Sequence, residues 1–113
     1  MNYTVIIPFY NEEKNISILN EQLVKNINKL TKEGRVFEII YVDDASNDDS
    51  FNELKKLTSN KVETSIIQHR VNLSQSGALN TGIIHSKYDN LIIMDGDLQN
   101  DPNDLEKMVL EYE

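Results

Sequence analysis

The chain has 113 residues, enough for one domain with a buried core, and its lack of Cys excludes disulfides, thiolate metal sites and a Cys nucleophile and fits a cytoplasmic protein. Its net charge of −8, from 11 basic and 19 acidic side chains, argues against a nucleic-acid partner, because such proteins usually present a basic patch to phosphate. No apolar run approaches the roughly 20 residues of a membrane span, and no basic region precedes the first apolar run, so that run is expected to be a strand rather than a signal peptide.

The first predicted strand covers residues 4–8 and is apolar on both faces, which is typical of a parallel sheet covered by helices. Pro8 is expected to end this strand, because proline cannot donate a hydrogen bond to a central ladder. Apolar residues then recur at helical spacing and predict a helix from about residue 12 to residue 32. Asn11 is the expected cap of this helix, and Gly34 is the expected stop after it.

The second predicted strand covers residues 36–42 and runs into Asp43 and Asp44. Ser46 and Asp49 then resemble a capping box, with an aspartate in place of the usual glutamate, and predict the start of a second helix. The apolar residues of that helix are Phe51, Leu54 and Leu57.

The second half of the chain repeats this alternation. Residues 62–68 are predicted as a weaker third strand, residues 74–86 as a third helix, and residues 91–94 as a short buried strand. Asp101 as cap and Pro102 at the first helical position predict a fourth helix. The apolar face of this helix carries Leu105, Met108, Val109 and Tyr112.

The regular alternation of strands and helices predicts an α/β fold: a Rossmann-like, mostly parallel sheet with helices on both faces. Right-handed crossovers are expected between its parallel strands. The chain ends in or just after the fourth predicted helix, so we expect it to be the N-terminal part of a longer protein.

Acidic side chains follow three of the predicted strands where the strands end. Glu12 follows the first strand, Asp43 and Asp44 the second, and Asp95 and Asp97 the last. Because the carboxyl ends of parallel strands share one edge of a sheet, at least four carboxylates are expected to converge there. Such carboxylates repel one another unless a cation or protons intervene.

The segment from Asp95 to Gln99 has two interpretations. Asp95 and Asp97 can bind one ion, because side chains at i and i+2 share a face, and Gly96 lets a ligand approach the backbone. Carboxylate and amide oxygens, including that of Gln99, are the ligands that Mg²⁺ and Mn²⁺ prefer. Asp-Gly is also ordinary turn chemistry, so a turn is the alternative.

Three further residues near the strand ends also have two interpretations. Asp44 either caps a helix or turn, or accepts a hydrogen bond from a nucleobase N–H. Tyr10 is either a half-buried loop aromatic or packs on a base or ribose. Glu12 either complements a helix dipole or accepts a hydrogen bond from a ribose hydroxyl or base.

Three segments at these strand ends resemble the motifs of family 2 glycosyltransferases, which have a GT-A fold. The first is Val5-Ile-Ile-Pro-Phe-Tyr-Asn-Glu-Glu13 and the second is Ile40-Tyr-Val-Asp-Asp-Ala-Ser-Asn-Asp48. The third, Asp95-Gly-Asp-Leu-Gln-Asn-Asp-Pro102, is similar to the version in dolichol-phosphate mannose synthases and bacterial polyprenyl-phosphate glycosyltransferases. The motifs stand in the family's order, and the resemblance spans nearly the whole chain.

The resemblance implies that residues 1–113 are the nucleotide-sugar-binding portion of a glycosyltransferase domain that continues beyond them. The implied reaction is transfer of a sugar from a nucleotide-diphosphate sugar to an acceptor such as a polyprenyl (dolichyl) phosphate, at the cytoplasmic face of a membrane. The implied cofactor is Mg²⁺ or Mn²⁺, held by Asp95, Asp97 and Gln99, with Asp95 and Asp97 as the catalytic residues. The implied nucleotide-sugar site is Pro8, Phe9, Tyr10, Glu12, Val42, Asp44, Asp95, Gly96 and Asp97.

One segment departs from the family pattern. The family often has Arg-Asn-x-Gly before its third helix, whereas this chain has Arg70-Val-Asn-Leu-Ser74, with an extra residue after Arg70 and Ser74 where glycine is common. Three alternatives to an active glycosyltransferase are a receiver-like Mg²⁺-binding signalling domain, a nucleotidyltransferase with a similar sheet, and a nucleotide-binding fragment without activity. The acidic pair after the second strand rather than the first argues against the receiver, and the lack of glycine in residues 8–12 argues against a nucleotidyltransferase.

Overall fold

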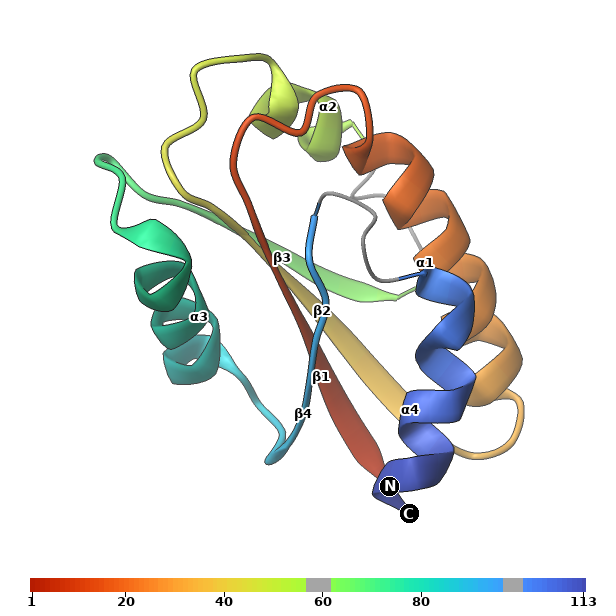
Figure 1. Cartoon of the computed structure of the whole chain (residues 1–113). Coiled ribbons are helices and arrows are strands. Elements are labelled where there is room, and N and C mark those ends of the chain that lie inside the picture. Colours follow the sequence, from red (N-terminus) through yellow and green to blue (C-terminus); the bar gives the residue numbers. More distant parts are fainter. Residues whose placement is uncertain (57–61, 97–100) are drawn as a thin grey trace.

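A four-stranded parallel sheet forms the centre of the computed structural model, which describes residues 1–56, 62–96 and 101–113 (Figure 1). The strands are β1 (Asn2–Phe9), β2 (Val36–Asp43), β3 (Glu63–Gln68) and β4 (Asn90–Ile93). The helices are α1 (Ile16–Thr31), α2 (Ser50–Lys55), α3 (Ser74–His85), the 3₁₀ turn η1 (Pro102–Asp104) and α4 (Leu105–Tyr112). The predicted order of elements and the parallel α/β class are confirmed.

The direction in which successive strands are added to the sheet reverses at β1. The strand order is β3-β2-β1-β4, so β2 and β3 are added on one side of β1, whereas β4 pairs with its other side. In open α/β sheets, the carboxyl ends of the strands at such a reversal form the crevice in which ligands bind. The topology therefore directs attention to the loops that follow β1 and β4.

The larger core lies between one face of the sheet and helices α1 and α4, which run side by side in Figure 1. Val5 and Ile7 of β1 point into this core, because alternate residues of a strand face the same side. They meet Leu19 and Leu23 of α1 and Leu105 of α4, and all five side chains are fully buried. The helical periodicity predicted for α1 is thus the periodicity of its buried face.

Helix α3 covers the opposite face of the sheet. Ala78 of α3 packs on Ile40 and Val42 of β2. Gly82 lies over Ile6 of β1, and a Cβ added to this glycine would be 2.5 Å from Ile6 Cγ2. A glycine in the middle of α3 is therefore explained by close packing of the helix on the strand. The prediction of helices on both faces is confirmed.

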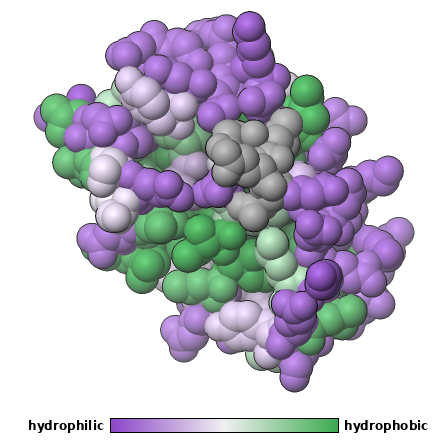
Figure 2. Space-filling view, in the orientation of Figure 1, coloured by the Kyte–Doolittle hydropathy of each residue, from purple (hydrophilic) through white to green (hydrophobic). Residues whose placement is uncertain are grey.

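The surface of the molecule differs between the strand ends and the sheet edge. Figure 2 shows hydrophilic side chains over α2 and the loops beside it, and an apolar band along β4 between α3 and α4. Ile93 of β4 and Ile83 of α3 are 43% and 45% exposed. None of the helices in the described part of the chain combines the length and the hydropathy needed to cross a membrane.

Helix α1 begins at Ile16, four residues later than predicted. Asn11 is not its cap: this residue has a φ of +52°, and its Oδ1 accepts a hydrogen bond from the Asn47 amide at 2.7 Å. The Glu12 carbonyl accepts hydrogen bonds from the amides of Asn15 and Ile16, so a turn precedes the helix. The prediction was wrong because the loop after β1 bonds to the loop after β2 instead of capping its own helix.

The predicted capping box of the second helix is also wrong. Helix α2 begins at Ser50, and its N-cap residue Asp49 makes no side-chain capping bond. The Ser46 hydroxyl instead donates to Asp43 Oδ1 at 2.6 Å, which holds the chain in the loop after β2. Leu57, the last apolar residue predicted for this helix, lies outside the described residues.

Two predicted helix boundaries are confirmed. Asp101 Oδ1 accepts a hydrogen bond from the Asn103 amide at 2.9 Å, and Pro102 opens η1, which leads directly into α4. Gly34 follows α1 with a φ of +93°, and its amide donates to the Thr31 carbonyl at 3.0 Å. A left-handed glycine in this position ends a helix without steric strain.

Candidate functional site

A cavity of about 390 Å³ opens at the carboxyl ends of β1, β2 and β4, where the strand order reverses. Its walls are Pro8, Phe9, Tyr10, Glu12, Asp44, Gln75, Ala78, Asp95 and Gly96. Seven of the nine residues predicted for the nucleotide-sugar site are therefore brought together. Of the other two, Val42 is fully buried under α3, and Asp97 lies outside the described residues, as does the predicted metal ligand Gln99. The ligand roles of all these residues stay predictions.

The chain after β4 lies directly against the end of β1. The Gly96 amide donates to the Pro8 carbonyl at 3.3 Å, and the Met94 amide donates to the Ile6 carbonyl at 3.0 Å. A Cβ on Gly96 would lie only 2.6 Å from Phe9 Cβ, so the two segments can approach this closely only because residue 96 is glycine. This contact fixes where Asp95 leaves the sheet.

The loop after β1 is joined to the loop after β2 by side-chain hydrogen bonds. The Asn11 amide donates to Ser46 Oγ and the Glu12 amide donates to Ser50 Oγ, both at 2.9 Å. Asp48 accepts hydrogen bonds from the Glu13 amide and from the Ser50 amide and hydroxyl. Burial disfavours the charged form of Asp48, but these hydrogen bonds outweigh it and lower its pKa. The two loops therefore act as one unit beside the cavity.

Tyr10 and Glu12 form the part of the cavity wall that belongs to the first loop. The Tyr10 side chain is 42% exposed, and its hydroxyl accepts a hydrogen bond from Asn47 Nδ2 at 3.1 Å. Tyr10 also borders a second cavity of about 750 Å³, whose wall includes Arg70. Glu12 is half-buried, and its Oε2 accepts a hydrogen bond from Asn15 Nδ2 at 3.0 Å. An aromatic face and a carboxylate are thus presented at one end of the site.

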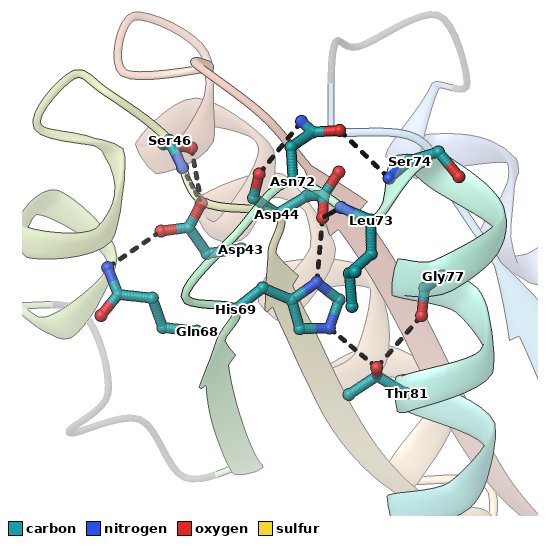
Figure 3. Close-up of polar contacts among 10 residues, drawn as sticks. All are labelled: Asp43, Asp44, Ser46, Gln68, His69, Asn72, Leu73, Ser74, Gly77 and Thr81. Atoms are coloured by element: carbon teal, nitrogen blue, oxygen red, sulfur yellow. Dashed lines mark hydrogen bonds and ion pairs between the residues drawn. The ribbon is translucent and has the colours of Figure 1, made fainter.

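Asp44 is held by the polar network drawn in Figure 3. Its Oδ1 accepts a hydrogen bond from the Leu73 amide at 2.7 Å and lies 2.9 Å from His69 Nδ1. His69 Nε2 lies 2.8 Å from Thr81 Oγ1, on α3. Asn72 Nδ2 donates to the Asp44 carbonyl at 3.3 Å, and the next residue along, Ala45, has a φ of +64°. His69 and the Leu73 amide, both in the loop between β3 and α3, therefore hold this carboxylate, and Thr81 of α3 holds His69 in turn.

Asp43, the other member of the acidic pair, does not face the cavity. Its Oδ1 accepts hydrogen bonds from the Ser46 amide and hydroxyl, and its Oδ2 accepts one from Gln68 Nε2 at 3.4 Å. Its side chain is fully buried. The expectation that both aspartates converge with the other acids is therefore wrong for Asp43, which supports the loop instead.

Asp95 connects the end of β4 to the start of α3. Its Oδ1 accepts a hydrogen bond from Gln75 Nε2 at 3.0 Å. Gln75 follows Ser74, which has a φ of +70° and whose amide donates to Asn72 Oδ1 at 3.1 Å. The left-handed conformation of Ser74 gives a physical reason for glycine at the corresponding position of the family pattern.

The predicted metal ligands lie only partly within the described residues. Within the described residues, no group of three or more His, Asp or Glu side chains is arranged to hold a metal ion. Two of the three predicted ligands, Asp97 and Gln99, lie outside those residues. The third, Asp95, is half-buried in the cavity wall and supplies the hard oxygen donor that Mg²⁺ and Mn²⁺ prefer. The chemistry of Asp95 is compatible with such an ion, and the three-ligand site stays a prediction.

Four residues of this site were not predicted from the sequence. Gln75 and Ala78 line the cavity, and His69 and Thr81 hold Asp44 from behind. His69 could have been found, because it follows β3 at the same edge of the sheet as the acids. The other three lie on α3, and a sequence pattern does not specify which turn of a crossover helix reaches a strand end.

Comparison with known proteins agrees with the three sequence motifs. The model of the family described as Glycosyl transferase family 2 matches residues 4–113. The undecaprenyl-phosphate 4-deoxy-4-formamido-L-arabinose transferase of Pectobacterium atrosepticum is 36% identical over 113 residues, which cover 98% of this chain and 33% of that protein. The chain therefore spans about a third of the length of this relative.

Two solved proteins have a similar fold. S. aureus TarS gives a TM-score of 0.74 at 25% identity over 97% of this chain and 32% of that chain. Its complex with UDP gives a TM-score of 0.70 at 26% identity, over 86% of this chain and 28% of that chain. The mannosyltransferase PcManGT from Pyrobaculum calidifontis, in complex with GDP-Man and Mn²⁺, gives a TM-score of 0.66 at 25% identity. This match covers 84% of this chain and 27% of that chain.

Proposed function

Because the chain belongs to glycosyl transferase family 2, we propose that residues 1–113 bind the nucleotide-diphosphate sugar of a metal-dependent sugar transfer. The observation that carries this proposal is the cavity at the strand-order reversal, whose wall includes Tyr10, Asp44 and Asp95. An aromatic face, a hydrogen-bond acceptor and a hard oxygen donor in one cavity match a base, its N–H groups and a metal-bound diphosphate.

The nucleoside is proposed to occupy the end of the cavity formed by the loops after β1 and β2. Tyr10 packs on the base or ribose with its exposed ring, and Glu12 accepts a hydrogen bond from a ribose hydroxyl or the base. Asp44 accepts a hydrogen bond from a base N–H. Pro8 and Phe9 form the cavity wall between the nucleoside and the diphosphate. Val42 is buried against α3 and supports this wall from the core.

The diphosphate is proposed to lie along Asp95, Gly96 and Asp97. Asp95, Asp97 and Gln99 would hold Mg²⁺ or Mn²⁺, which when bound supplies Lewis-acid stabilisation of the departing nucleoside diphosphate. Three acidic side chains line the described wall of this cavity, Glu12, Asp44 and Asp95, and an anionic donor would be repelled there without a cation. PcManGT, with its GDP-Man and Mn²⁺, supports this arrangement by analogy.

The whole protein is proposed to transfer the sugar to a lipid-linked phosphate such as a polyprenyl phosphate, at the cytoplasmic face of a membrane. The name of the Pectobacterium atrosepticum relative, an undecaprenyl-phosphate sugar transferase, supports this choice of acceptor. Asp95 and Asp97 would act in the transfer through the diphosphate and its metal. The second candidate function is binding of the donor without transfer of its sugar. It is favoured because the chain covers only 33% of the length of that relative.

The test is calorimetric titration of the 113-residue chain with UDP, GDP, CDP and ADP, each with and without Mn²⁺. We expect at least one nucleotide to bind and Mn²⁺ to tighten its binding. Asp95→Asn and Asp97→Ala should each abolish the Mn²⁺-dependent part, because a lost carboxylate removes a metal ligand. Asp89→Asn is the matched control, since Asp89 is exposed in the loop before β4, at the opposite end of the sheet.

No binding of any of these nucleotides, or unchanged Mn²⁺ dependence in both site variants, would refute the proposal. Binding tightened only by a phosphoryl-donor mimic would favour the receiver-like alternative instead. The strand order argues against that alternative, because receiver domains have the order 2-1-3-4-5, whereas this sheet has 3-2-1-4. Incubation with the sugar donor and polyprenyl phosphate, followed by mass spectrometry, separates transfer from binding alone.

A further inference from the structure

The two carboxylate oxygens of Asp44 have different surroundings. Oδ1 receives the Leu73 amide at 2.7 Å and the imidazole of His69 at 2.9 Å, which together use both of its lone pairs. Oδ2 carries none of the contacts drawn in Figure 3. Within the described residues, no buried side-chain oxygen or nitrogen lacks a hydrogen-bond partner. Oδ2 must therefore reach open space, and the cavity that Asp44 lines provides it.

His69 is itself fixed on both sides. Its amide donates to the Asp43 carbonyl at 2.8 Å, which holds the backbone at the end of β3. Its Nε2 lies 2.8 Å from Thr81 Oγ1, and the Thr81 hydroxyl donates to the Gly77 carbonyl at 3.0 Å. The side chains of His69 and Asp44 are only 8% and 6% exposed. A buried imidazole anchored at both nitrogens is a rigid support for the carboxylate beside it.

We propose that His69 is a positioning residue for ligand recognition: together with the Leu73 amide it commits Oδ1 of Asp44 to the protein and aims Oδ2 into the cavity as the acceptor that Asp44 offers to a base N–H. This inference rests on the proposed function. Without His69, one amide alone holds the carboxylate, which can then rotate about its Cβ–Cγ bond. Hydrogen bonds weaken steeply with misalignment, so the nucleotide would be bound less tightly.

The test is a double-mutant cycle on the 113-residue chain with Mn²⁺ and the tightest-binding of UDP, GDP, CDP and ADP. His69→Leu removes both ring nitrogens at similar volume, and Asp44→Ala removes the acceptor. We expect His69→Leu to weaken binding about tenfold in the wild-type background and less than about twofold in the Asp44→Ala background. A residue that supported only the fold would weaken binding equally in both.

Two further variants keep the test decisive. His69→Asn retains an amide donor near the position of Nδ1, so it should bind within about threefold of wild type, whereas His69→Leu does not. Thr81→Val removes the hydroxyl behind the imidazole and should weaken binding only when Asp44 is present, even if His69→Leu fails to fold. His85→Leu is the matched control, because this second histidine is exposed at the end of α3 and should leave binding unchanged.

The imidazole can also be observed directly, because the chain has only two histidines. Binding of the nucleotide should shift the ¹⁵N resonances of His69 and leave those of His85 in place. Additive effects of His69→Leu and Asp44→Ala, or full binding by His69→Leu, would overturn the positioning role while leaving the proposed function intact. Absence of nucleotide binding in the wild-type chain would overturn both.

Discussion

Replacement of Gly96 by alanine should damage the site more than it damages the fold. An added Cβ would lie 2.6 Å from Phe9 Cβ, 3.2 Å from the Pro8 carbonyl oxygen and 3.4 Å from Phe9 Cα. Carbon atoms pack best at about 3.5–4.0 Å, so the segment after β4 must move away from β1 by about 1 Å. Overpacking of this kind costs about 1–3 kcal/mol. At about 4 °C for each kcal/mol, we expect the melting temperature to fall by about 4–12 °C.

The same displacement moves Asp95, which adjoins Gly96, away from the cavity wall. A misplacement of about 1 Å at a reacting group can cost up to about a hundredfold, so Mn²⁺-dependent nucleotide binding should weaken by about tenfold or more. Calorimetric titration well below the melting temperature measures this loss, and circular dichroism measures the melting temperature itself.

Gly34→Ala is the matched control for this prediction. Gly34 has a φ of +93° but open space around its missing Cβ, and it follows α1, which places it away from the cavity. Alanine there should cost about 1–2 kcal/mol through backbone strain alone. The two variants are thus expected to melt at similar temperatures, with nucleotide binding weakened only in Gly96→Ala. Normal binding by Gly96→Ala, or equal loss in Gly34→Ala, would contradict the reasoning.

Two further predictions concern stability. Ser74→Gly should raise the free energy of unfolding by about 0.5–1 kcal/mol, because Ser74 has a φ of +70°. Ser76→Gly, inside the regular helix, should lower the free energy of unfolding by about 0.5 kcal/mol. Urea unfolding of both variants measures the difference, and a loss of stability in both would contradict the prediction. The Arg35 guanidinium and then the Tyr3 hydroxyl bind Glu113 and lower its pKa to about 2 from 4.5. Because the folded-state pKa is depressed, this stabilisation is present above pH 4.5 and is lost as the pH falls toward 2. Arg35→Gln should therefore flatten the fall in melting temperature between pH 5 and pH 2, and an unchanged slope would exclude this ion pair as a source of acid sensitivity.

Features that depend on periodicity and topology could be predicted from the sequence. Short continuous apolar runs identified the strands, and a period of 3.6 residues identified the helices, because strands of a covered parallel sheet are buried on both faces and helices on one. The rule that strand ends share an edge then brought together Tyr10, Asp44 and Asp95, which lie far apart in the chain. Neither step requires knowledge of any individual side-chain contact.

Features that depend on a specific contact between loops could not be predicted. Asn11 has the sequence context of a helix cap, but the amides of the loop after β2 compete for its side chain. Asp43 and Asp44 are equivalent in the sequence, and only the end of the strand determines that Asp44 reaches the cavity. In these cases the sequence showed which side chains can accept hydrogen bonds, but it did not show which groups donate to them.

The left-handed residues Asn11, Ala45 and Ser74 limit how this site could be transferred to another protein. They are the non-glycine residues of positive φ in the described part of the chain, and each adjoins a residue of the cavity wall. Such a conformation costs about 1–2 kcal/mol and persists only where neighbouring contacts impose it. Here, those contacts come from other loops and from the start of α3. A graft of any one motif onto a different sheet would relax to ordinary backbone angles, so the smallest portable unit is the set of three loops together.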